Sequence, residues 1–388
     1  MSFLAFLPPL VVFTIGILFH RISTALIVGI ILAGLIATNF ALLETTTLVA
    51  SRFINTLEFH QLTSWATAKE CDTLFIFGFL IFSGILIELI TISGGAKALI
   101  HLVSNSIKTR KRAETSVLAL SHCLFIDDYL CSLTVGSVLC PLTDKLRVPR
   151  VKLAFLVNAL AASLAVICPI SSWAAAISGF LSENGIGEQF EEHILVIASP
   201  SAVYLQTLPY ILFSFTLIAT VWAIVRWRFS FGLMAHHEQQ ALAHPEESTS
   251  PEGKTEKDTY HLADFLVPLL SLMFLAVFWL LFWGEYTLFG GSRSLVAALQ
   301  NAPIALVLFL SSLIAATISL FYFFFMVRRL SIKRLPSIAF NGFYMMLPAI
   351  SVLTLAWTLG DLLRIDLKTG EVLAALLGRS IPLFFLPC

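Results

Sequence analysis

Long apolar runs separated by short polar breaks extend along most of the chain. A helix that crosses a bilayer needs roughly 17–25 mainly apolar residues. Runs of this kind lie near residues 3–19, 24–43, 73–92, 152–180, 194–225, 263–284, 302–327 and 337–359, and a shorter one closes the chain at 371–387. The pattern predicts an all-α polytopic membrane protein with about nine to ten membrane segments.

One long polar stretch, residues 227–262, interrupts this apolar pattern. We expect it to be a polar cytoplasmic linker between a first membrane half, residues 1–226, and a second membrane half, residues 263–388. Its three histidines, His236, His237 and His244, show no repeated metal-ligand spacing, so we expect no metal site there.

The composition agrees with a membrane location. The chain has 388 residues, of which 58% are hydrophobic and 12% are charged, whereas soluble domains carry about 25% charged residues. Basic and acidic residues number 24 each, and this balance gives no reason to expect nucleic-acid binding. The six cysteines form no C-x-x-C pair, which argues against a zinc site, and we expect no cofactor. The expected partners are membrane lipid and small ions or a small organic solute, and the sequence leaves a homodimer open.

The charged loops predict the orientation in the membrane, because short loops rich in Lys and Arg remain in the cytoplasm. Such loops lie at 20–21, 108–112, 145–152, 226–228 and 328–334, whereas the loop 181–193 carries four glutamates and no basic residue. The first basic residue, Arg21, follows the N-terminal apolar run instead of preceding it, unlike a secretory signal. We therefore predict a retained first span, an N-terminus outside and a location in a plasma (inner) membrane of bacterial type.

The segment 113–142 leaves one basic cluster and returns to another, so both of its ends are expected on the cytoplasmic side. Two full crossings would need about 40 residues, and the segment has 30. A re-entrant hairpin of two half-spans fits this length better. The alternative is one ordinary helix with a polar end, which would place the basic loop 145–152 outside.

Two adjacent carboxylates, Asp127 and Asp128, lie in this hairpin within the stretch FIDDYLCSLTVGS. A charged group inside a membrane is costly and is a functional hypothesis by default. Burial and a neighbouring like charge both favour the protonated form of a carboxyl group, so sodium and protons would compete for the site. We favour Asp128 as the sodium ligand and Asp127 as its partner or proton carrier. Asp127 as a helix cap is the alternative.

A second irregular point is CPISSWAAA, at 168–176. Pro169 removes a backbone donor in the middle of the span 152–180, which predicts either a broken helix with oxygen ligands or a simple kink. Together with the hairpin, the candidate ion- or substrate-binding residues are Asp127, Asp128, Ser132, Thr134, Ser171 and Ser172. His122 is a candidate proton relay, with helix packing as the alternative.

The stretches 80–99 and 356–376 resemble each other at a spacing of 276 residues, which pairs Gly84 with Gly360 and Gly94 with Gly370. Their spans are predicted to run in opposite directions, as an inverted repeat requires. The counterpart of Asp127 would fall beyond Cys388, so we expect the second membrane half to be incomplete.

Four blocks resemble the NhaC-type sodium/proton antiporters of the ion transporter superfamily. They are FIDDYLCSLTVGSVLCPLTDKLRVPRVKLAF (125–155), CPISSWAAA (168–176), SGGAK (93–97) and MLPAISVLTLAWTLGDLLRIDLKTGEVLA (346–374). The resemblance implies a secondary active transporter with two inverted repeats, each with a re-entrant hairpin and a broken helix. The chain departs from the family pattern at Cys131, at Ala174 and in the absence of a second Ser/Thr-Gly-Trp block.

The function expected from the residues and the resemblance is sodium/proton antiport, with sodium and protons as the transported ions. One alternative is a sodium- or proton-coupled exchanger of organic acids or amino acids, and another is a truncated remnant that does not transport. An intramembrane enzyme is disfavoured, because the aspartate pair lacks the D-x-x-D spacing of a phosphate-binding magnesium site and no Ser-His-Asp order is present.

Overall fold

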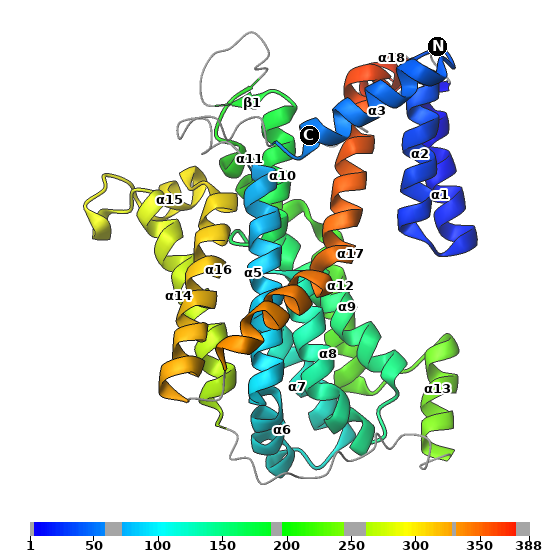
Figure 1. Ribbon diagram of the computed structural model, residues 1–388. Helices are drawn as coiled ribbons and strands as arrows, with labels where there is room; N and C mark the ends of the chain where they lie inside the picture. The colour runs from blue at the N-terminus through cyan, green and yellow to red at the C-terminus, as the bar shows by residue number, and fades with distance from the viewer. Residues whose placement is uncertain (1–3, 59–71, 188–195, 244–260, 328–330, 378–388) are drawn as a thin grey trace. The chain divides into compact units, whose positions relative to one another are not determined.

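The computed structural model describes residues 4–58, 72–187, 196–243, 261–327 and 331–377 (Figure 1). Helices form almost all of the regular structure in these ranges, and the one sheet there is the short parallel pair of β1 (Ile186–Gly187) and β2 (Val196–Ile197). The chain divides into two compact units, one made of Met1–Leu74 with Met346–Cys388 and the other of Phe75–Met345. Each unit is described by itself.

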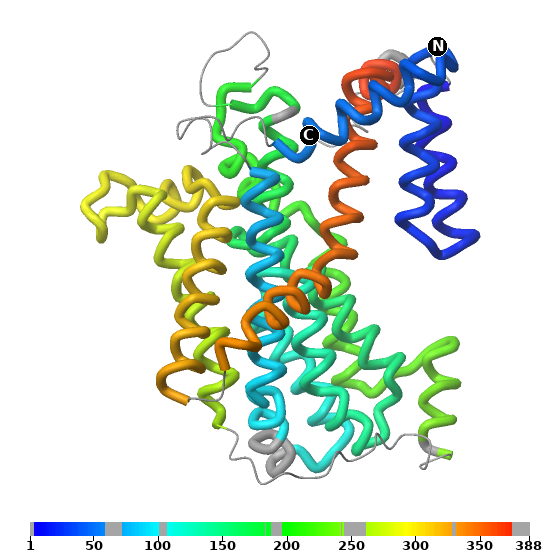
Figure 2. Tube along the Cα trace, viewed as in Figure 1, coloured from blue at the N-terminus to red at the C-terminus, as the bar shows by residue number. Residues whose placement is uncertain are grey.

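The first unit contains the N-terminal helices and the end of the chain. Its elements are α1 (Leu7–Phe19), α2 (Ile22–Ala37), α3 (Leu42–Thr56), the later part of α17 (Leu335–Asp361), a π-helical turn (Leu362–Asp366) and α18 (Thr369–Leu377). The antiparallel pair α1–α2, blue in Figure 2, turns at His20, which has a left-handed φ of 52°. Leu26 and Ile30 of α2 share a core cluster with Leu359 and Leu362.

An ion pair fastens α3 to the π-helical turn in this unit. The Arg52 Nε and Nη2 groups donate to the two oxygens of Asp366, at 3.0 and 2.9 Å. Such a fork matches the planar guanidinium to the carboxylate. The helix α3 was not among the predicted spans, because Glu44, Arg52 and several hydroxyl residues make it too polar for a bilayer crossing.

The second unit holds the longer helices. They are α5 (Asp72–Ser93), α6 (Gly95–Ser106), α7 (Arg110–Cys123), α8 (Asp128–Lys145), α9 (Arg150–Ile167), α10 (Ser172–Glu183), α11 (Pro200–Thr207), α12 (Leu212–Trp227), α13 (Gly232–Ala243), α14 (Ala263–Trp283), α15 (Leu295–Asn301), α16 (Ile304–Phe321) and the first part of α17. The helices α14 and α16 pack side by side (Figure 1).

Six helical ranges in the described part of the chain are long and apolar enough to cross a membrane. They are Asp72–Ser93, Arg150–Ile167, Leu212–Ala241, Ala263–Trp283, Ile304–Met326 and Ile332–Asp366, and shorter apolar helices lie at Leu4–Phe19 and Ile22–Ala37. The prediction of an all-α polytopic membrane protein is confirmed. Two predicted spans are interrupted, since 152–180 breaks after Ile167 and 194–225 divides into α11 and α12.

The α5–α17 crossing depends on glycine. A Cβ atom on Gly342 would lie 2.7 Å from the backbone nitrogen of Ile85, so only glycine allows this backbone approach. One residue away, the amide of Asn341 donates to Glu88 at 2.9 Å. Glu88 is buried inside a membrane helix, and this neutral amide satisfies one of its oxygens.

The beginning of the predicted linker is more ordered than the sequence analysis expected, because residues 232–243 form the helix α13. Glu238 of α13 lies 2.6 Å from the buried ammonium of Lys152 on α9. The same ammonium lies 2.9 Å from Glu114 of α7. This charge cluster fastens α13 to α7 and α9. His244 and the rest of the linker up to residue 260 lie outside the described residues.

We predict that Gly342→Ala lowers the free energy of unfolding by about 1–3 kcal/mol, because the added methyl group overpacks the crossing. Gly179→Ala is the matched control, since a Cβ atom there meets nothing within 4 Å and alanine favours a helix by about 1 kcal/mol over glycine. Unfolding in mixed detergent micelles measures both variants. A stability of Gly342→Ala equal to that of the control would contradict the close crossing.

We predict that Lys152→Ala costs about 3–5 kcal/mol of unfolding free energy, because it leaves the buried Glu114 carboxylate without a counter-charge. Glu238→Gln keeps Lys152 paired with Glu114 and is expected to cost clearly less. The same micelle unfolding measurement compares the two. The reverse order of losses would show that Glu114 is not the group that Lys152 neutralises.

Candidate functional site

The helices α7 and α8 form a helical hairpin that turns at residues 124–127. With 14 and 18 residues, they are roughly 21 and 27 Å long at 1.5 Å per residue. Both are shorter than the roughly 30 Å hydrocarbon core of a bilayer. Asp127 has extended backbone dihedrals and is the N-cap of α8, so the chain leaves the turn directly into the second helix.

The helices α9 and α10 form one interrupted helix around the CPISS stretch. The helix α9 ends at Ile167, Cys168 and Ser171 are extended, and α10 begins at Ser172. Pro169 lies in this break and has no backbone donor to continue the helical ladder. The interruption therefore occurs where the proline and serines predicted an irregular backbone.

Two hydrogen bonds join the hairpin turn to the helix break. The backbone amide of Ser172 donates to the carbonyl of Ile126 at 3.1 Å. The Ser172 hydroxyl donates to Oδ1 of Asp127 at 2.6 Å. We call the turn 124–127 together with the break 168–171 and Ser172 the junction. It brings together Asp127, Asp128, Ser171 and Ser172 from two predicted motifs.

Asp127 is fully engaged within the junction. Its Oδ2 atom accepts from the backbone amide of Leu130 at 2.8 Å, while Oδ1 accepts from Ser172. The residue is only 1% exposed. This geometry is that of a helix cap, which the sequence analysis held as the alternative to a proton carrier.

Asp128 has a different environment, because it is half-buried and begins α8. The indole of Trp173 on α10 is its hydrogen-bonding neighbour. The N-terminal ends of α8 and α10 both lie at the junction, and helix N-termini carry partial positive charge that favours nearby carboxylates. The two helix ends therefore offset part of the charge of the two carboxylates.

The hydroxyl of Ser171 is occupied by the protein itself. It donates to the carbonyls of Ala165 and Cys168, at 2.6 and 3.0 Å, and it accepts from the amide of Ala174. Tyr204 of α11 also donates its hydroxyl to the carbonyl of Val166. These bonds satisfy backbone groups that the break leaves open, so Ser171 positions the backbone instead of offering a free ligand.

Tyr204, which binds the last turn of α9 next to the junction, was missed by sequence reasoning. It is 1% exposed, and its contact with Val166 joins segments 38 residues apart. A tyrosine inside an apolar run is an ordinary feature of a membrane helix, so the sequence contains no signal for this contact.

The remaining candidates lie away from the junction. Ser132 is one turn further along α8 and lines a cleft beside α9. Thr134 is buried, and its hydroxyl has no hydrogen-bond partner among the described residues. Nδ1 of His122 is 2.7 Å from the carbonyl of Leu118, and its ring meets Trp222 of α12 edge-on at 5.7 Å. These contacts favour a packing role for His122.

The described residues contain no group of three or more His, Cys, Asp or Glu side chains placed to hold a metal ion. A sodium site at the junction would therefore depend on one carboxylate with hydroxyl, carbonyl or water oxygens. That set of ligands suits a hard cation which exchanges readily.

Capped half-helices that meet at carboxylates, within a protein of several membrane-spanning helices, are the arrangement of a secondary transporter. Residues 164–388 match the Na+/H+ antiporter family, and the chain belongs to this family. Sodium and protons are the ions that the family transports, and the match indicates a transporter rather than an enzyme.

One relative is an uncharacterized protein of Haemophilus influenzae (strain ATCC 51907 / DSM 11121 / KW20 / Rd). It is 27% identical to this chain over 386 residues, which make up 98% of this chain and 70% of the relative. The likeness therefore includes the hairpin, which the family match does not reach. No solved structure matches the chain.

We predict that Asp127→Ala destabilises the protein far more than Asp128→Ala. Removal of the cap and of the bond to Ser172 is expected to cost about 2–4 kcal/mol, whereas loss of the half-buried Asp128 is expected to cost less than about 1 kcal/mol. Ser172→Ala removes one of the two bonds and should give an intermediate loss. Unfolding in mixed micelles checks the order, and equal losses at the two aspartates would contradict it.

Proposed function

We propose that the protein exchanges sodium for protons at the junction, with Asp128 as the carboxylate that both ions share. The observation that carries this proposal is the different engagement of the two aspartates. Both oxygens of Asp127 accept hydrogen bonds from the junction, whereas Asp128 remains half-buried at the start of α8. A carboxylate that binds a mobile ion must be reachable, and Asp128 is the more exposed of the two aspartates.

Exchange at this site requires no covalent step. Sodium favours the ionised form of Asp128, and a proton removes the charge that sodium needs. The two ions therefore exclude each other, and binding of one releases the other. Ser172 remains a candidate oxygen donor at the junction in this proposal, and Thr134 is a candidate only further along α8, while Asp127 and Ser171 hold the junction in shape.

The charge of the junction favours a cation over an organic anion as the bound species. In transporters that bind carboxylate substrates, helix N-termini face the substrate. Here Asp127 and Asp128 already occupy the position in front of the α8 and α10 N-termini. A further carboxylate would meet two negative charges at close range, which is unfavourable.

The membrane placement that accompanies this proposal follows the basic loops. We place the α7–α8 hairpin as a re-entrant element entering from the cytoplasmic side, with Arg110 and Lys145 near that surface and the junction at depth. The N-terminus would then lie outside in a plasma membrane. Backbone breaks at membrane depth are tolerated only where protein or a watery cavity surrounds them, and the bonds of the junction meet that requirement.

We predict that Asp128→Asn reduces sodium-driven proton movement by roughly tenfold or more, because loss of a charged ligand is worth about 1.5–3 kcal/mol. Dissipation of an imposed pH gradient by sodium in everted vesicles is the measurement. Asp128→Glu keeps the charge and should retain part of the activity.

Glu285→Gln is a suitable control, since Glu285 lies in an exposed ion pair with Arg293 and has no hydrogen bond or ion pair to Asp128 in the described part of the chain. Full activity of Asp128→Asn would refute the role of this carboxylate. A wild-type protein that responds neither to sodium nor to organic acids would instead support the reading as a remnant that does not transport.

A further inference from the structure

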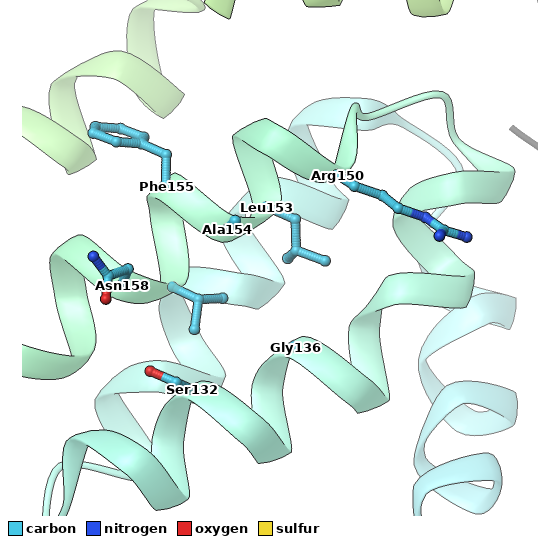
Figure 3. A pocket seen from close by; sticks show the side chains of 8 residues that line it. Ser132, Gly136, Arg150, Leu153, Ala154, Phe155 and Asn158 are labelled. Atoms are coloured by element: carbon cyan, nitrogen blue, oxygen red, sulfur yellow. The ribbon is translucent and has the colours of Figure 1, made fainter. Parts of the chain in front are cut away.

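A cleft of about 590 Å³ lies along the seam between α8 and α9 (Figure 3). Ser132 and Gly136 line it from α8, and Arg150, Phe155 and Asn158 are among the residues that line it from α9. Its volume is sufficient for several water molecules, each of which occupies about 30 Å³ in the liquid. Ser132 is one of the binding residues predicted from the sequence, whereas no pattern in the sequence marks Asn158.

One end of the cleft carries its two neutral polar side chains, next to apolar residues such as Phe155. Ser132 and Asn158 lie on the two facing helices at that end, opposite to the end where Arg150 lies (Figure 3). Neither side chain makes a hydrogen bond to another residue in the described part of the chain. Their hydroxyl and amide oxygens therefore remain available to water or to an ion.

The α8 wall of the cleft leads toward Asp128. Residues four apart share one face of a helix, so Asp128, Ser132 and Gly136 follow one another along α8. Ser132 is roughly 6 Å from Asp128 along the helix axis. A Cβ atom on Gly136 would meet nothing within 4 Å, which shows that the wall is open at that turn.

The outer end carries a charge that is already balanced. Arg150 donates three hydrogen bonds to Asp144, the shortest at 2.8 Å from Nη2 to Oδ2. Lys145 and Arg147 are exposed on the neighbouring turn and do not line the cleft. At the other end, Ser132 and Asn158 are uncharged and offer two side-chain oxygens among apolar neighbours, and oxygen is the ligand that hard cations prefer.

We propose that the α8–α9 cleft is an aqueous route to Asp128, and that Ser132 and Asn158 form a site on it where a monovalent cation exchanges part of its water shell for protein oxygens. This assignment rests on the proposed exchange at Asp128. It adds Asn158 as a binding residue and makes the cleft the path by which sodium arrives.

The first test measures access to the cleft in full-length protein. Ser132→Cys and Asn158→Cys are treated with a positively charged, membrane-impermeant thiol reagent, and labelling is read at the modified peptide by mass spectrometry. Arg147→Cys on the exposed turn is the control that should react. Leu160→Cys on α9 is the control that should not react, because Leu160 is fully buried.

Labelling at both cleft positions supports the route, and labelling as low as at Leu160→Cys overturns it. Sodium at about ten times its apparent Kd is expected to slow labelling at positions 132 and 158 about tenfold, because only about a tenth of the sites then remain free. The rate at position 147 should not change. Rapid labelling that sodium, lithium and potassium all leave unchanged overturns the cation site.

The second test closes the cleft. Gly136→Leu places a side chain in the open space and is expected to reduce sodium-driven proton movement about tenfold or more, whereas Gly179→Leu, which also faces open space on α10, should not. Wild-type exchange by Gly136→Leu overturns the route.

Exchange that depends on Asp128 without labelling of the cleft refutes this inference alone, and protected labelling without exchange refutes the proposed function alone.

Discussion

The structure depends on the bond between the Ser172 hydroxyl and Asp127, because it joins two breaks in the helical ladder at one place. A helical hairpin and an interrupted helix each leave backbone groups without intrahelical partners, and a membrane interior offers no water to satisfy them. Asp127 caps α8 and accepts from the first residue of α10, so a single carboxylate serves both elements. Its burial, at 1% exposed, follows from this double use.

This constraint separates the roles of the adjacent aspartates. On a helix, consecutive residues diverge by about 100°, so a side chain that points back to cap the turn leaves its neighbour facing elsewhere. Asp127 faces Ser172 and the first turn of α8, and Asp128 faces Trp173 and remains partly accessible. We propose on this basis that one carboxylate of the pair is structural and the other binds ions, with the cleft beside Ser132 as the route to the second.

Much of this arrangement follows from sequence patterns that have a direct physical cause. Apolar length predicts the spans, basic clusters predict that 113–142 returns to the side it left, and Pro169 predicts the break. Contacts between distant segments have no such signal. The structure is therefore needed to show the bonds that Ser171 and Tyr204 make to open carbonyls. It is also needed to show that Asn158 has no hydrogen bond to another described residue and that Glu238 joins α13 to α9. The charged residues of the linker predicted that it is solvated. One of these charges, Glu238, is instead paired with Lys152, which lies 86 residues earlier in the chain, so the sequence could not reveal the contact.

The central claim is that Asp128 exchanges a proton for sodium while Asp127 holds the junction together. Proton release from the purified protein on addition of sodium, at neutral pH in weakly buffered detergent solution, tests it most directly. The account predicts a stoichiometric release of protons by the wild type and by Glu285→Gln, and none by Asp128→Asn. Release by Asp128→Asn equal to that of the wild type would contradict the account.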